Sequence, residues 1–314
     1  MGRLASATLF VSLIGSTGCV ALGTVNLPVE QLRAKYGTRD DGYFSYQGTQ
    51  VRYRDEGAGP VVFLLHGVCS SLDTWDGWTR ALKAEFRVIR VDVPGFGLTG
   101  PATDKRRYTR EGSVEFLDDL AAHLGVPRFS IAGNSLGGYI AWSYAVAHPE
   151  KVEKLILVDP VGYKQKMPGL LAFASNPVIR PFARVMMPRS MVENAIAEVY
   201  GDSSKLTPEV KQRYFDLAMR EGNKGSYVDI FTMLRTENDS PTLSADIPRI
   251  QAPTLLMWGT KDAWIPPEQL DNWRRDLPNA SFVTFEGLGH VPMEEAPAMT
   301  VEPALRFLRR SDPP

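Results

Sequence analysis

The sequence predicts an α/β protein, in which a mostly parallel central sheet carries helices on both faces. Short uninterrupted apolar runs, typical of strands buried on both faces, alternate with amphipathic helical patterns. The alternation breaks at residues 160–247, where helical patterns follow one another without a strand. We therefore expect residues 43–159 and 248–310 to form one core of single-domain size, with 160–247 inserted over the strand ends as a helical lid.

Residues 1–25 have the composition of a targeting segment. No residue from Leu4 to Val25 is charged, and Arg3 precedes this run, which resembles a secretory signal peptide. The residues that end at Cys19 partly match a bacterial lipobox, although Ser16 stands where leucine is usual. A retained membrane anchor is the third interpretation, because the run is about long enough to span a bilayer. All three predict export to the bacterial periplasm or attachment to the cell envelope.

The other elements are expected in the following order. Residues 26–42 are polar and basic and predict a linker or short helix, and residues 43–46 and 50–54 flank a Gly-containing turn, which predicts a β-hairpin. Further strands are expected at 61–65, 86–91, 129–133, 154–158, 254–258 and 281–285. Helices are expected at 73–84, at 113–124 between an N-cap at Ser113 and a stop at Gly125, and at 297–310.

The insertion is rich in methionine, among helical patterns broken by prolines. Methionine suits a pliable apolar pocket wall, but methionines at helical spacing are as often ordinary core residues, and the sequence leaves both interpretations open. The methionines concerned are Met167, Met186, Met187, Met191, Met219 and Met233.

Residues 133–137 carry the first chemical signal, Gly-Asn-Ser-Leu-Gly, between a predicted strand and a predicted helix. A G-x-S-x-G sequence in this context predicts a sharp turn that holds the serine in a strained backbone conformation. Gly133 and Gly137 are expected where a Cβ would collide with the neighbouring strand and helix. The turn would lift the Ser135 hydroxyl clear of the sheet, beside the positive end of the helix, as a nucleophile requires.

Four histidines occur in the chain, which narrows the choice of a base for Ser135. A serine hydroxyl needs a base within hydrogen-bond reach, and histidine titrates in the useful range. His123 lies in a predicted amphipathic helix and His148 at a helix end, so both are expected at the surface. His66 directly follows a buried strand and is expected to pack within a turn. His290 lies in a Gly-rich loop after a strand, and we predict that it is the base.

The imidazole needs a carboxylate that fixes its tautomer. Asp262 ends a Gly-x-x-Asp loop after the strand at 254–258, at the edge where open α/β sheets build their sites. Asp159 also follows a strand, and either residue would give the order Ser, Asp, His. The loop favours Asp262, with Asp159 as the rival. The oxyanion needs two N–H donors, for which we predict the amides of Leu136 and of Val68.

Composition excludes several other classes of function. The formal net charge is −1 with both signs interspersed, so no concentrated basic face for nucleic acid is expected. The two cysteines, Cys19 and Cys69, do not form a disulfide framework, and no Cys/His cluster has metal-ligand spacing. The predicted chemistry needs neither a metal nor an organic cofactor.

Taken together, these segments resemble the α/β-hydrolase fold family, specifically its single-domain, lidded, esterase-like branch. The resemblance covers about residues 43–310 outside the insertion, and it implies that Asp92 is structural. The matching motifs are His66-Gly67, Asp92-Val93-Pro94-Gly95-Phe96-Gly97, Gly133-Asn134-Ser135-Leu136-Gly137-Gly138, Gly259-Thr260-Lys261-Asp262 and Gly289-His290.

The resemblance implies a serine hydrolase that cleaves a moderately apolar carboxylic ester. Serine at the elbow argues against haloalkane dehalogenases and epoxide hydrolases, which use aspartate there. Carbon–carbon bond hydrolases of ring-fission products share Gly-Asn-Ser-x-Gly-Gly, but usually carry a tryptophan soon after the histidine, where this chain has Val291-Pro292-Met293-Glu294. That alternative predicts a cation in the pocket, with Arg180, Arg184 and Arg189 as the candidates. Perhydrolase or thioesterase activity and a non-enzymatic, ligand-binding role also stay open.

Overall fold

The computed structural model describes residues 22–310. The expectations for a cleaved signal, a lipidated Cys19 or a retained anchor fall mainly on residues outside this range. Within it, no helix is both long and apolar enough to cross a membrane.

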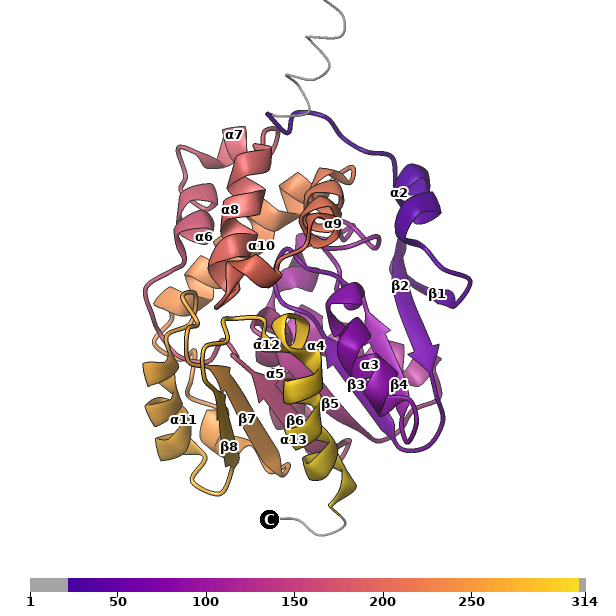
Figure 1. Ribbon diagram of the computed structural model, residues 1–314, viewed down its shortest axis with the longest axis vertical. Helices are drawn as coiled ribbons and strands as arrows, with labels where there is room; N and C mark the ends of the chain where they lie inside the picture. The colour runs from indigo at the N-terminus through magenta and orange to yellow at the C-terminus, as the bar shows by residue number, and fades with distance from the viewer. Residues whose placement is uncertain (1–21, 311–314) are drawn as a thin grey trace, which may run out of the picture.

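An eight-stranded sheet forms the centre of the molecule, in the order β1-β2-β4-β3-β5-β6-β7-β8 (Figure 1). β1 and β2 form the predicted antiparallel hairpin, β2 pairs antiparallel with β4, and the other neighbours pair in parallel. The mostly parallel sheet predicted from the sequence is therefore confirmed. The strands are β1 (Asp41–Tyr46), β2 (Thr49–Glu56), β3 (Val61–Leu65), β4 (Arg87–Val91), β5 (Phe129–Asn134), β6 (Val152–Val158), β7 (Thr254–Gly259) and β8 (Ser281–Phe285).

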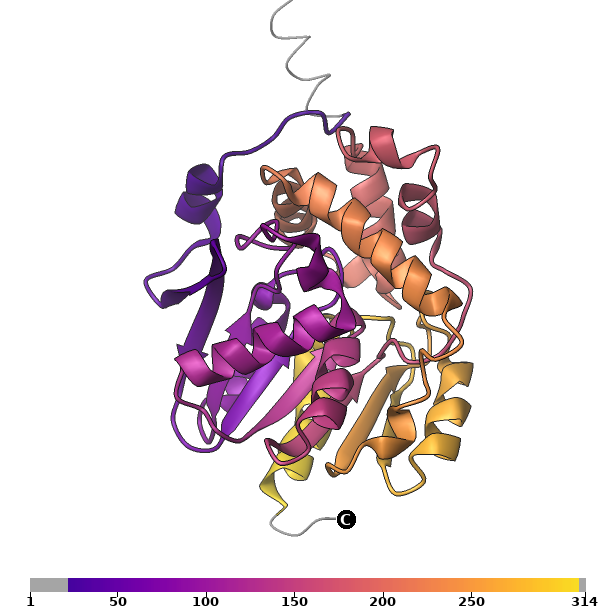
Figure 2. The same cartoon turned by 180° about the vertical axis from the view of Figure 1, so that it is seen from behind.

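Helices cover both faces of the sheet. Figure 1 shows α3 and α13 across one face, and Figure 2 shows α4 and α5 across the other. Every residue of β5 and β7 is buried, since both strands lie between parallel neighbours and beneath helices. The helices outside the insertion are α2 (Val29–Tyr36), α3 (Asp76–Leu82), α4 (Arg110–His123), α5 (Leu136–Ala147), α11 (Leu270–Asp276), α12 (Pro292–Glu295) and α13 (Pro297–Arg309).

The chain between β6 and β7 forms a helical insertion beyond one end of the sheet (Figures 1 and 2). Of the six methionines noted above, only Met187 lines the pocket described below, while Met219 is buried and Met186 is exposed. The insertion contains α6 (Gly169–Ala174), α7 (Arg180–Ala183), α8 (Arg189–Val199), α9 (Pro208–Met219) and α10 (Asn223–Asp239).

One predicted helix start was wrong, and another helix begins with a different type of turn. The helix expected at 113–124 begins at Arg110, because the Thr109 hydroxyl accepts a hydrogen bond from the Gly112 amide and caps the helix, which leaves Ser113 inside it. The helix expected at 73–84 starts as a 3₁₀ turn over Leu72–Trp75, which the Ser71 hydroxyl caps by accepting from the Asp73 amide.

Candidate active site

Ser135 lies at the turn between β5 and α5, with φ 55° and ψ −114°. This is a backbone conformation that residues with a side chain rarely adopt, and it costs on the order of 1–3 kcal/mol. Close packing around Gly133 and Gly137 holds Ser135 in this conformation. A Cβ on Gly133 would lie 2.2 Å from the carbonyl oxygen of Gly137, and a Cβ on Gly137 would lie 2.2 Å from that of Leu65. The packing therefore requires glycine at both positions and keeps the turn sharp.

The loop after β3 packs directly against this turn. A Cβ on Gly67 would lie 3.0 Å from the Cβ of Ser135, so the missing side chain lets the two segments meet. His66 fixes the loop, since its Nδ1 lies 2.7 Å from the Gly67 carbonyl and its Nε2 accepts from the Val93 amide at 3.0 Å. Complete burial lowers the pKa of His66 and favours the neutral ring. His66 thus has the packing role expected of it.

Two backbone amides beside Ser135 are free of protein acceptors. In residues 22–310, neither the Val68 N–H nor the Leu136 N–H donates a hydrogen bond. Both residues are nearly buried, with 9% and 3% of their surface exposed. Unpaired, buried N–H groups are rare in proteins, so two of them flanking one serine could receive an oxyanion.

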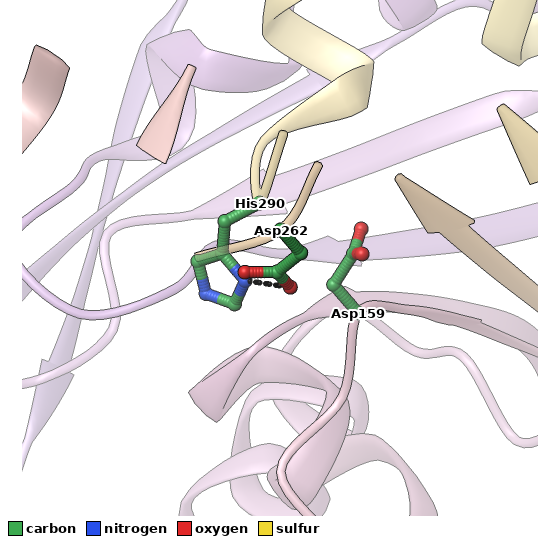
Figure 3. A group of neighbouring side chains, drawn as sticks. All are labelled: Asp159, Asp262 and His290. Carbon is green, nitrogen blue, oxygen red and sulfur yellow. Dashed lines mark hydrogen bonds and ion pairs between the residues drawn. The ribbon is translucent and has the colours of Figure 1, made fainter. Parts of the chain in front are cut away.

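His290 and Asp262 form a buried hydrogen-bonded pair (Figure 3). The His290 Nδ1 lies 2.7 Å from the Asp262 Oδ2, while the Asp262 Oδ1 accepts from the amides of Trp264 at 2.7 Å and Ile265 at 2.9 Å. Because a carboxylate can only accept, Nδ1 carries the proton and Nε2 is left free to act as a base.

Asp159 lies beside this pair but does not contact the imidazole (Figure 3). It is fully buried, its Oδ1 accepts from the Gly259 amide at 2.9 Å, and its Oδ2 has no hydrogen-bond partner among the described residues. Burial, and next the charge of Asp262, raise the pKa of Asp159 well above its usual range. The geometry therefore favours Asp262 over Asp159 as the partner of His290.

Asp159, Asp262 and His290 are also a candidate metal site. Each could offer one ligand atom, and these atoms lie within 4.8 Å of one another. Both oxygens of Asp262 are already engaged, by His290 and by two amides. A metal ion would have to displace at least one of these hydrogen bonds. The arrangement thus fits a proton relay better than a metal site.

Ser135 and His290 line one pocket beneath the insertion. No hydrogen bond joins their side chains in the described structure, and such contacts are often long until substrate is bound. The insertion supplies much of the apolar wall, through Leu170, Met187, Val192, Ile196 and Val199.

No lysine, arginine, aspartate or glutamate of the described chain lines this pocket. The three arginines considered for a cationic pocket lie elsewhere. Arg184 pairs with Asp229 and Arg189 with Glu193, and neither these two nor Arg180 is a lining residue. Cys69 does line the pocket, but burial raises the pKa of its thiol, so it stays protonated.

Two residues that hold the His290 loop were missed from the sequence. The Asn134 amide group donates to the carbonyls of His290 at 2.9 Å and Val158 at 3.1 Å. The buried carboxylate of Glu295 accepts from the amides of Gly289 and Gly201, both at 2.9 Å. Asn134 belongs to the Gly-Asn-Ser-Leu-Gly motif, so the sequence contained a signal for it. The sequence around Glu295 contains no pattern that predicts its contact with both the His290 loop and the insertion.

The strained turn at Ser135 and the buried His290–Asp262 pair lie at the ends of strands in a mostly parallel sheet. Together with the two unpaired amides, they have the arrangement of an α/β protein of the hydrolase type. A family model described as the alpha/beta hydrolase fold matches residues 60–297. The chain therefore belongs to the α/β-hydrolase fold family, as the sequence motifs predict.

Three relatives illustrate the range of this family. A 2-hydroxy-6-oxononadienedioate/2-hydroxy-6-oxononatrienedioate hydrolase of Paraburkholderia phymatum is 30% identical, covering 77% of this chain and 86% of the relative. Lipase 1 of Psychrobacter immobilis is 26% identical, covering 94% and 93%. The crystal structure of a bacterial membrane phospholipase A superposes with a TM-score of 0.74 at 27% identity, covering 98% of each chain.

Proposed function

We propose that the protein is a serine hydrolase that cleaves carboxylic esters through an acyl-enzyme. The Ser135 Oγ attacks the ester carbonyl carbon while the His290 Nε2 takes its proton, and Asp262 stabilises the imidazolium. The Val68 and Leu136 amides hold the oxyanion of the tetrahedral intermediate.

His290 then gives the proton to the departing alcohol as the C–O bond breaks, which leaves the acyl group on Ser135. A water molecule attacks the acyl carbon, with His290 as its base, and releases the acid and the free serine. Every proton transfer uses groups of this chain and water.

The observation that carries this proposal is the convergence of Ser135, His290 and Val68 on a pocket that no charged residue of the described chain lines. The unpaired Val68 amide is in that lining, and the unpaired Leu136 amide directly follows Ser135 in the chain. An uncharged ester with an apolar acyl or alcohol part fits such a pocket, because its binding needs no charged partner. The Psychrobacter lipase supports the same chemistry.

Carbon–carbon bond hydrolysis is the second candidate, because the Paraburkholderia relative and two further relatives are named as hydrolases of 2-hydroxy-6-oxononadienedioate and 2-hydroxy-6-oxononatrienedioate. Their names describe dicarboxylate substrates, and a buried carboxylate requires a cationic or hydrogen-bonding partner. The absence of arginine and lysine from the described pocket lining favours the ester.

We also propose that residues 1–25 direct export or membrane attachment, on the strength of the uncharged run from Leu4 to Val25. Mass spectrometry of the mature N-terminus, isolated from the native host, distinguishes a cleaved signal, a lipidated Cys19 and a retained anchor. An unmodified chain that is recovered entirely from the cytosol would contradict all three.

The function is tested by hydrolysis of p-nitrophenyl esters with acyl chains of increasing length, alongside a dienedioate ring-fission product. We expect turnover of the esters, with an optimum chain length that reports the size of the pocket. Turnover of the ring-fission product alone would transfer the proposal to carbon–carbon hydrolysis.

A further inference from the structure

Large apolar side chains are exposed together on the insertion. Among residues 22–310, eight large hydrophobic side chains are exposed, and five of them fall between residues 173 and 186. We call these five the lid patch. Its members and their exposed fractions are Val178 (75%), Phe182 (64%), Val185 (61%), Phe173 (48%) and Met186 (40%).

The backbone holds most of the lid patch in one compact turn. The amide of Phe182 donates to the carbonyl of Ile179 at 2.9 Å, and the amide of Met186 donates to the carbonyl of Phe182 at 2.9 Å. Residues spaced by three and four, as Val178, Phe182 and Val185 are, share a face of such helical structure. Exposed apolar side chains gathered in this way mark a binding surface, whereas single ones do not.

The segment that carries the lid patch is basic in sequence. Residues 161–192 contain five basic residues and no acidic residue, in a chain whose formal net charge is −1. Lys164 and Lys166 are exposed and form no ion pair in the described structure. Arg180 also forms no ion pair among the described residues, whereas Arg184 is paired with Asp229 and Arg189 with Glu193. Basic residues around exposed apolar side chains are the composition of segments that bind anionic lipid surfaces.

The described chain also begins beside the lid patch. Leu22, 53% exposed, is followed by Gly23, whose carbonyl accepts from the Met187 amide at 3.3 Å. The ammonium of Lys224 donates to the carbonyls of Gly23 at 3.1 Å and Val25 at 2.9 Å, which fastens this segment to the insertion (Figure 1). Residues 22–25, the described end of the uncharged run, therefore lie against the insertion beside this patch.

We propose that the lid patch docks on the surface of an anionic phospholipid bilayer. Its apolar side chains would enter the boundary between headgroups and acyl chains, while the unpaired Lys164, Lys166 and Arg180 of the same segment contact lipid phosphates. A second copy of this chain is a poorer occupant, because a twofold contact would place this basic surface against itself. Leu170 and Met187 border the patch in sequence and also line the pocket, so docking would bring lipid-held substrates next to Ser135.

The proposal is tested on the full chain by fluorescence. All six native tryptophans are buried, so one introduced on the surface reports its own surroundings. We would compare Phe182→Trp with Tyr43→Trp on the hairpin, which is 37% exposed, using phosphatidylglycerol/phosphatidylcholine vesicles with and without brominated acyl chains. Whatever the first 21 residues contribute to vesicle binding is the same in both variants.

We expect bromine to quench the added emission of Phe182→Trp at least twofold and to leave that of Tyr43→Trp unchanged. Equal emission of Phe182→Trp with and without bromine would overturn the proposal. Quenching that is as strong in pure phosphatidylcholine would overturn the preference for anionic lipid. A dimer of the wild type in the absence of vesicles is a further outcome. If the double variant Val178→Ser/Phe182→Ser abolishes that dimer, the patch is assigned to a second copy of the chain.

Activity provides a separate measurement. The Val178→Ser/Phe182→Ser variant should hydrolyse a soluble p-nitrophenyl ester at the wild-type rate and a vesicle-held ester at least fivefold more slowly. If the variant and the wild type have equal rates on both substrates, docking is contradicted. If the wild type does not hydrolyse the soluble ester, the proposed function is contradicted, and the quenching result still tests docking by itself.

Discussion

Asp159 and Asp262 lie side by side after the adjacent strands β6 and β7, yet only Asp262 reaches His290 (Figure 3). The Oδ2 of Asp262 is 2.7 Å from the imidazole Nδ1, and its Oδ1 is held by two amides. Asp159 instead binds the Gly259 amide and leaves one oxygen unpartnered among the described residues. The loop after β7 therefore decides which of the two carboxyl groups can orient the imidazole.

Exchanging each carboxyl group for an amide should separate the two roles. Asp262→Asn should lower kcat for ester hydrolysis by about 10³–10⁴-fold, because an amide in its place favours the wrong imidazole tautomer. Asp159→Asn keeps the bond to the Gly259 amide and should retain most of the activity. Steady-state kinetics on one p-nitrophenyl ester checks both, and activity that survives Asp262→Asn but not Asp159→Asn would reverse the assignment.

The buried Asp159 should also make stability depend on pH. Its pKa is raised above the ordinary 3.8, so above about pH 4 the folded chain holds a proton that the unfolded chain loses. This contribution lowers the free energy of unfolding as pH rises, with a slope of at most about 1.4 kcal/mol per pH unit.

Asp159→Asn removes that titration and should become more stable than the wild type as pH increases from 4 to 7. Urea unfolding of both proteins at several pH values measures the difference. A difference that stays constant with pH would show that Asp159 ionises normally in the fold.

Ser135→Ala should remove ester turnover by at least about 10³-fold while the melting temperature stays nearly unchanged, since the hydroxyl makes no hydrogen bond in the described structure. Ser143→Ala is the matched control, because its buried hydroxyl on α5 is also unpartnered and does not line the pocket. The control should keep wild-type kinetics. Cooperative unfolding at a much lower temperature in Ser135→Ala would mean that the turn itself had been misinterpreted.

Gly137→Ala should destabilise the fold by about 3 kcal/mol or more, because the new Cβ would lie 2.2 Å from the Leu65 carbonyl oxygen. Gly169→Ala, at the first residue of α6, meets no heavy atom within 4 Å and should be neutral or stabilising by up to about 1 kcal/mol. Urea denaturation measures both variants. Similar stability of the two would contradict the tight packing at the elbow.

Ala195→Leu should shift the preferred acyl chain to shorter lengths, because Ala195 on α8 lines the pocket and a larger side chain takes up its space. We expect kcat/KM for the longest accepted ester to fall roughly tenfold, with little change for the acetate. Ala147→Leu, exposed at the end of α5, serves as the control. An unchanged chain-length profile in Ala195→Leu would mean that the acyl group binds elsewhere.

The sequence by itself determined the fold class and the elbow. Strand and helix periods are local patterns, and the elbow needs glycine at residues 133 and 137 whatever the rest of the chain does. The residues next to His290 also predict its position in a Gly-rich loop after a strand. The helix start at Arg110 was missed, because Ser113 was expected to be the cap, whereas the Thr109 hydroxyl accepts from the Gly112 amide and Ser113 lies inside the helix.

Only the tertiary structure decided which carboxyl group faces His290, which methionine lines the pocket, and how Asn134 and Glu295 hold the His290 loop. These contacts join segments that are far apart in the chain, across strand ends or between the insertion and the core. Their geometry follows from the order of strands in the sheet and from the path of each loop. Chain order alone does not contain that information, because Asp159 and Asp262 satisfy it equally.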